Sequence, residues 1–185
     1  MGERSMSGRA WILMAMTVVA SLLAAAPLQA HGPTRQKVVE KVEINAPADK
    51  VWAALGNFQD MSWHPAIAKT EGSGGNDKDA KRVLTLKPGG TIAETLTKYD
   101  AAGKTLSYEI TAVDVKVLPV SNYSATLSVE AQGGKSVVEW KSAFYRGFLN
   151  NDPPPELSDE AAVKAIKGVF RSGLDALKTK LEAGG

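Results

Sequence analysis

The chain has 185 residues, with 22 Lys and Arg against 20 Asp and Glu and a formal net charge of +2 at pH 7. A charge balance this close to neutral gives no support for a nucleic-acid partner or for an anionic membrane surface. Because the sequence contains no cysteine, it excludes disulfides, thiolate metal sites, iron–sulfur clusters and a cysteine nucleophile.

The first thirty residues are predicted to form a secretory signal peptide. Arg4 and Arg9 give a positively charged start, residues 10–26 are small and apolar, and Ala30 ends a sequence typical of a cleavage site. A membrane anchor is the alternative, because the apolar run reaches the lower limit of spanning length, roughly 17 residues. We expect cleavage, a periplasmic location and no membrane attachment afterwards. Residues 31–36 are then predicted to be a flexible arm, and residues 37–185 a single domain.

A strand, a helix and a bend are predicted between residues 42 and 65. Val42 and Ile44 alternate as in a strand, and the fixed φ of Pro47 suits the first turn of a helix. The apolar residues that follow are spaced by three and four, which predicts a short amphipathic helix with a stripe of Val51, Trp52, Leu55 and Phe58. Residues 56–57 weaken that helix, and the segment M-S-W-H-P at 61–65 is predicted to bend.

Alternating apolar residues separated by turn signals then predict an antiparallel meander. The expected strands are residues 67–71, 82–86, 91–99, 105–114, 123–131 and 135–145. Residues 115–122 are expected to bend or loop, because Pro119 cannot donate to a sheet ladder. Turns at such short intervals favour successive hairpins over βαβ units, which need helices between strands.

A long helix is predicted at the C-terminus. Ser158 is a suitable N-cap, with acidic residues in the turn that follows. The apolar stripe of this helix is expected to consist of Val163, Ile166, Phe170, Leu174, Leu177 and Leu181. Gly168 and Gly173 each weaken a helix by about 1 kcal/mol relative to Ala, so we expect close packing or local bending there.

The stretch from Ile44 to Phe58, followed by Trp63 and Pro65, resembles the opening of the SRPBCC superfamily of START domains, Bet v 1 proteins and polyketide cyclase/dehydrase-like proteins. Further segments are similar to the polyketide cyclase-like branch, namely residues 82–96, 107–110, 138–144 and 173–178. The resemblance implies an α+β helix-grip fold, with a curved antiparallel sheet of about six to seven strands wrapped on a long C-terminal helix. It also implies two short helices after the first strand and a ligand cavity between sheet and helix.

Within this superfamily, the N-terminal signal pattern, the start H-G-P-T and the block from Leu118 to Val129 resemble the MxaD-type periplasmic proteins of bacterial methanol oxidation. This resemblance implies a non-enzymatic accessory role, with a methanol dehydrogenase and its cytochrome c acceptor as partners and no cofactor. A small apolar ligand in the cavity is compatible with that role. The alternatives are a carrier of lipids or other hydrophobic ligands and an enzyme of the cyclase or dehydratase kind.

Aromatic residues dominate the candidate site, and each could either line a ligand cavity or fill the core. They are Trp63, Tyr99, Tyr108, Tyr123, Trp140 and Phe144. The buried polar groups among them are expected to find hydrogen-bond partners, so a wholly apolar lining is not expected.

Three polar residues complete the candidate site. His64 is the only histidine inside the domain, and with Glu94 as its carboxylate partner it would transfer protons in the enzymatic alternative. A surface or capping role is its other interpretation. Arg82 and Glu94 are predicted to pair across adjacent strands, as a structural bridge or as the polar end of the cavity. The sequence contains no motif with metal-ligand spacing and no G-x-S-x-G elbow of a serine hydrolase.

Overall fold

The computed structural model describes residues 32–183, so the predicted signal peptide lies outside the described part of the chain. Seven strands, two α-helices and a 3₁₀ turn follow one another along it. They are β1 (Gln36–Ile44), α1 (Ala48–Leu55), β2 (Ile67–Ser73), β3 (Lys81–Leu86), β4 (Thr91–Asp100), β5 (Thr105–Val113), β6 (Val120–Gln132), β7 (Lys135–Arg146), η1 (Pro155–Leu157) and α2 (Asp159–Ala183). None of the helices within residues 32–183 is long and apolar enough to cross a membrane.

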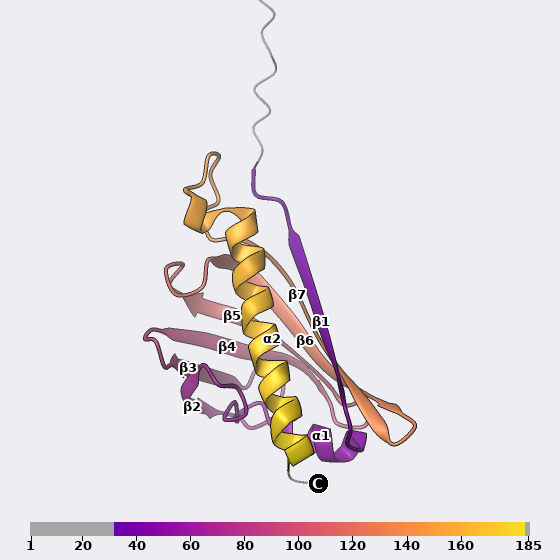
Figure 1. Ribbon diagram of the computed structural model, residues 1–185. Helices are drawn as coiled ribbons and strands as arrows, with labels where there is room; N and C mark the ends of the chain where they lie inside the picture. Colours follow the sequence, from indigo (N-terminus) through magenta and orange to yellow (C-terminus); the bar gives the residue numbers. More distant parts are fainter. Residues whose placement is uncertain (1–31, 184–185) are drawn as a thin grey trace, which may run out of the picture.

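All seven strands belong to one antiparallel sheet, in the order β1-β7-β6-β5-β4-β3-β2. Strands β2 to β7 form a meander of consecutive hairpins, and β1 is added beside β7. Helix α2 lies across one face of this sheet and runs close to β1 (Figure 1). The predicted helix-grip fold, with its curved antiparallel sheet and its long C-terminal helix, is therefore confirmed.

Helix α2 begins and packs largely as its sequence predicts. Ser158 Oγ accepts a hydrogen bond from the Ala161 N–H at 3.1 Å, which confirms the predicted N-cap. The residues that α2 buries are Ala162, Ile166, Phe170, Gly173, Leu174, Leu177 and Leu181. A Cβ atom at Gly173 would overlap His64 and lie 3.1 Å from the Trp140 ring, whereas one at Gly168 would meet nothing within 4 Å. The predicted close packing therefore occurs at Gly173 but not at Gly168.

Strand β6 begins earlier than predicted, at Val120 rather than at Tyr123. The register between β6 and β7 shifts between Ser121 and Ser124, and Asn122 within this irregularity has a φ of 47°. A bulge of this kind absorbs an extra residue without ending the ladder. The chain can therefore rejoin the sheet directly after Pro119.

The prediction of two short helices after the first strand is wrong in one respect: in the described chain, α1 is followed by turns instead of a second helix. The turns are closed by i→i+3 hydrogen bonds, from the His64 N–H to the Met61 carbonyl at 2.9 Å and from the Ile67 N–H to the His64 carbonyl at 3.1 Å. Pro65 has no N–H with which to continue a helical ladder. These turns lead the chain under α2 and fix the position of His64.

Candidate ligand cavity

An apolar cavity of about 210 Å³ lies between α2 and the inner face of the sheet. Its walls come from the turns after α1, from strands β2 to β7, from the turn between β3 and β4, from the loop before β6 and from α2. The lining residues are Met61, His64, Ala66, Ile67, Leu84, Leu86, Pro88, Ile92, Glu94, Tyr108, Ile110, Val117, Leu118, Tyr123, Trp140, Ile166 and Val169. Most of this surface is aliphatic or aromatic, which suits an apolar ligand.

The predicted site residues are only partly brought together in this cavity. Those that line it are His64, Glu94, Tyr108, Tyr123 and Trp140. Trp63, Arg82 and Phe144 are buried outside the lining, and Tyr99 stacks on Trp52 at 5.7 Å between ring centroids. The aliphatic wall of the cavity was not predicted from the sequence. Leu84, Ile92 and Ile110 share the inward face with Glu94 and Tyr108, so the strand alternation could have indicated them.

Trp140 lies at the centre of the aromatic residues. Its ring stacks on Phe170 of α2, with 4.2 Å between centroids, and lies 5.7 Å from the ring of Trp63. Its Nε1–H donates a hydrogen bond to the Tyr108 hydroxyl at 3.0 Å, so one predicted polar contact of the lining is present. Burial raises the pKa of both Tyr108 and Tyr123, which keeps both hydroxyls protonated at neutral pH. The Trp63 indole N–H, also buried, has no partner among the described residues.

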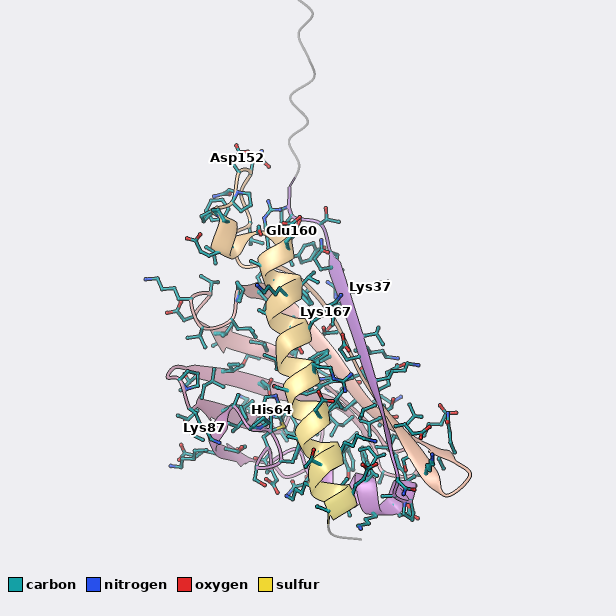
Figure 2. All side chains as sticks on the ribbon, in the orientation of Figure 1. Lys37, His64, Lys87, Asp152, Glu160 and Lys167 are labelled. Carbon is teal, nitrogen blue, oxygen red and sulfur yellow. The ribbon has the colours of Figure 1, made fainter. Side chains whose placement is uncertain are left out.

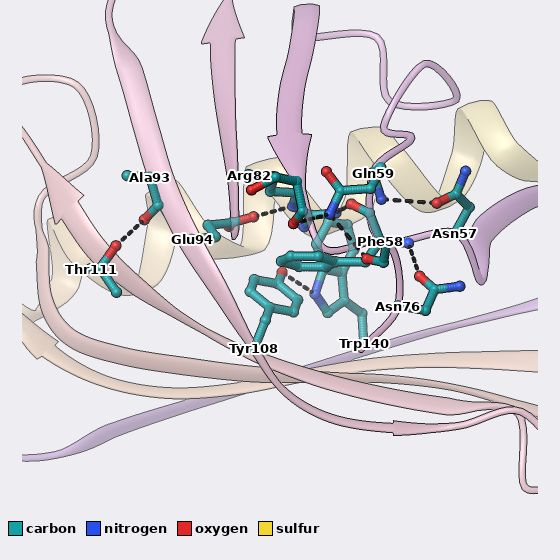
Figure 3. Close-up of polar contacts among 12 residues, drawn as sticks. Asn57, Phe58, Gln59, Asn76, Arg82, Ala93, Glu94, Tyr108, Thr111 and Trp140 are labelled. Carbon is teal, nitrogen blue, oxygen red and sulfur yellow. Dashed lines mark hydrogen bonds and ion pairs between the residues drawn. The ribbon is translucent and has the colours of Figure 1, made fainter. Parts of the chain in front are cut away.

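Arg82 and Glu94 face each other across β3 and β4 and form a buried ion pair (Figure 3). Arg82 Nε donates to Glu94 Oε2 at 2.6 Å, and Arg82 Nη1 donates to the Phe58 carbonyl at 2.7 Å. The guanidinium lies 4.2 Å from the centroid of the Phe58 ring. The predicted bridge is confirmed, and Glu94 also lines the cavity, so the two interpretations of this pair coexist. Burial raises the pKa of Glu94, while the charge of Arg82 opposes that shift.

His64 lies close to α2 (Figure 2) and is buried, with 2% of its surface exposed. Its Nδ1 accepts a hydrogen bond from the Ala66 N–H at 3.2 Å, which places the ring proton on Nε2. Nε2 lies 3.0 Å from the Val169 carbonyl and donates to it. Burial lowers the pKa of His64, so the ring is neutral.

The hydrogen bonds that His64 and Glu94 make are not those of the predicted acid–base pair. Both residues line the cavity, but His64 bonds to two backbone groups and Glu94 bonds to Arg82. Glu94 turns to Arg82 because the hairpin register places these two residues directly opposite each other. The arrangement offers a ligand an apolar surface with one carboxylate.

The outer face of the sheet carries a second hollow. This hollow is shallower, has a volume of about 420 Å³ and is lined by Lys37, Thr97, Ser107, Thr126 and Lys141, among others. The hydroxyls of Ser107 and Thr126 bond each other at 2.9 Å, which leaves fewer groups to bind a ligand there. Within residues 32–183, no group of three His, Cys, Asp or Glu side chains is arranged to hold a metal ion.

Comparisons with known proteins agree with this architecture. The chain is 27% identical over 139 residues to MLP-like protein 423 of Arabidopsis thaliana, covering 70% of this chain and 88% of the relative. A solved structure of an uncharacterised protein from Bacillus thuringiensis matches with a TM-score of 0.67 and 27% identity, covering 79% of this chain and 98% of that one. The structure of XoxI from Bacillus cereus also gives 0.67, with 28% identity and coverage of 78% and 94%.

The match to a protein family covers most of the chain. The family model described as "Polyketide cyclase / dehydrase and lipid transport" matches residues 35–182, which include every strand and nearly all of α2. The sheet, the helix that grips it and the cavity between them all fall within this range. The chain therefore belongs to the polyketide cyclase/dehydrase and lipid transport family, within the SRPBCC superfamily.

Proposed function

We propose that the protein is a non-enzymatic binding protein that holds a small apolar ligand between α2 and the sheet. The observation that carries this proposal is the cavity of about 210 Å³, whose walls are mostly aliphatic and aromatic. An apolar cavity of roughly 150 Å³ accepts a benzene-sized molecule, and drug-sized ligands occupy roughly 300 Å³ or more. The size therefore favours a ligand of one or two rings over a long lipid chain.

Filling the cavity tests this function directly. Ile110 lines the cavity and is only half-buried, so Ile110→Phe adds a ring there with limited overpacking. Val39 is 52% exposed on β1, so Val39→Phe adds a ring outside the cavity and serves as the matched control. We expect the purified protein to bind naphthalene in calorimetric titration, Ile110→Phe to lose at least about tenfold in affinity through lost contact area, and Val39→Phe to bind like the wild type. Equal binding by both variants would contradict the proposal.

For the cellular setting, we propose the periplasmic accessory role of the MxaD type, beside a methanol dehydrogenase and its cytochrome c. The support is the signal-like N-terminus and the similarity of residues 118–129. Native mass spectrometry of periplasmic extract is the test, under conditions that keep proteins and small ligands bound. A bound dehydrogenase or cytochrome is the expected result. A stoichiometric small molecule without any protein partner would instead favour a carrier.

A further inference from the structure

Few polar groups in the cavity are free to bind a ligand. The ring nitrogens of His64 bond to the backbone at Ala66 and Val169. The indole N–H of Trp140 bonds to the Tyr108 hydroxyl. Glu94 is different: its carboxylate accepts one side-chain hydrogen bond from the described residues, through Oε2 from Arg82 Nε (Figure 3). Its other oxygen, Oε1, keeps its capacity to accept a hydrogen bond.

The charge of this site also restricts the ligand. Glu94 and Arg82 are 5% and 2% exposed, and together they are electrically neutral. An anionic ligand would place a second negative charge beside Glu94, and a cationic ligand would leave one net positive charge in an apolar cavity. Both arrangements are costly, because a buried charge needs a partner. A neutral ligand avoids both costs.

We propose that the cavity takes a small neutral phenol, with its ring between α2 and the sheet and its hydroxyl donating a hydrogen bond to Glu94 Oε1. This inference rests on the proposed ligand-binding function and specifies the ligand class. A donor on the ligand suits Glu94, because an ionised carboxylate can only accept hydrogen bonds. The ring suits walls that include Tyr108, Tyr123 and Trp140, and the volume admits one or two fused rings.

A ligand series on the wild-type protein separates this inference from the function beneath it. The probes are 1-naphthol, 1-fluoronaphthalene, which has a similar shape but no donor, and 1-naphthoate, which is anionic. We expect 1-naphthol to bind at least about tenfold more tightly than 1-fluoronaphthalene, because hydrogen bonds to charged groups are the stronger class. We expect 1-naphthoate to bind at least about tenfold more weakly than 1-naphthol, because its charge has no partner in the cavity.

The double variant Arg82→Met/Glu94→Leu then assigns the hydrogen bond to Glu94. Replacing both partners of a buried ion pair with apolar residues of similar size is often neutral for stability, so this variant is expected to fold, which circular dichroism checks. We expect 1-naphthol to lose its advantage while 1-fluoronaphthalene binds as before. If the variant does not fold, the wild-type series alone decides the requirement for a donor.

Each result of these binding measurements bears on a different part of the proposal. Equal affinity of the wild type for 1-naphthol and 1-fluoronaphthalene would overturn the phenol inference and leave the apolar-ligand function intact. An advantage of 1-naphthol that persists in the double variant would overturn the role of Glu94. Absence of binding by every probe would overturn the proposed function itself.

Discussion

Glu94 and His64 occupy the same cavity, are almost equally buried and yet play different parts. Glu94 belongs to an ion pair between neighbouring strands and lines the cavity. His64 is a neutral ring that joins the turns after α1 to the carbonyl of Val169 in α2. Burial alone therefore does not identify a reactive group. What decides is whether the partners of the group leave any of its hydrogen-bonding capacity free.

The largest effect is expected when the charge of Glu94 is removed. Glu94→Leu removes the carboxylate that pairs with Arg82 in the described part of the chain and leaves a buried guanidinium uncompensated. We expect the free energy of unfolding to fall by about 3–5 kcal/mol, the usual loss when one member of a buried ion pair is removed. Urea denaturation followed by tryptophan fluorescence measures the loss.

The control for this prediction is the double variant Arg82→Met/Glu94→Leu, in which no buried charge remains. It should recover most of the stability lost by Glu94→Leu. A single variant within about 1 kcal/mol of the wild type would show that Arg82 finds another partner or reaches water.

A smaller effect is expected from adding a methyl group where α2 contacts His64. Gly173→Ala places a methyl group against the His64 ring and within 3.1 Å of Trp140, so we expect overpacking of about 1–3 kcal/mol, partly offset by about 1 kcal/mol of helix propensity. Gly168→Ala is the matched control, because its methyl group meets nothing within 4 Å and should stabilise the protein by up to about 1 kcal/mol. Thermal denaturation compares the two variants. Equal stabilisation by both would mean that the contact between α2 and His64 is loose.

The fold could be predicted from the sequence because it depends on local patterns. The Ser158 N-cap, the apolar stripe of α2 and the turn signals between strands each determine the structure of residues close to them in sequence. The ion pair was also predictable, because a hairpin register places Arg82 opposite Glu94. The second helix was predicted from the family resemblance alone, and local turns with Pro65 replaced it.

The bonding of His64 could not be predicted in the same way. Its partners are the backbone groups of Ala66 and Val169, and any residue type could supply them. Val169 is also distant in sequence and reaches His64 only because α2 packs over the turns after α1. The prediction therefore chose Glu94, on the facing sheet, as the carboxylate partner of His64, although Glu94 pairs with Arg82. Contacts to backbone groups across a tertiary interface leave no pattern of residue types to detect.

The smallest effect is expected in the pH dependence of stability, which tests whether His64 is neutral in the folded protein. Burial lowers the pKa of His64 in the folded protein below its ordinary value of 6.5, so the unfolded chain takes up the proton first as the pH falls. Stability due to the neutral ring is therefore fully present above pH 6.5 and is lost between 6.5 and the lower pKa of the folded state. The slope of this loss is at most about 1.4 kcal/mol per pH unit.

The variant His64→Gln keeps an N–H donor for the Val169 carbonyl but cannot take up the proton. Glu94 and His31 are present in both proteins, so their own titrations cancel when the two are compared. We expect the wild type to lose about 1 kcal/mol more than His64→Gln between about pH 7.5 and about pH 5 in urea denaturation. If the free energies of unfolding of the two proteins change in parallel with pH, the folded state tolerates protonated His64. The inference that a neutral His64 joins the turns after α1 to α2 would then be wrong. A divergence confined to acidic pH would instead support His64 as a neutral structural contact between the turns after α1 and α2.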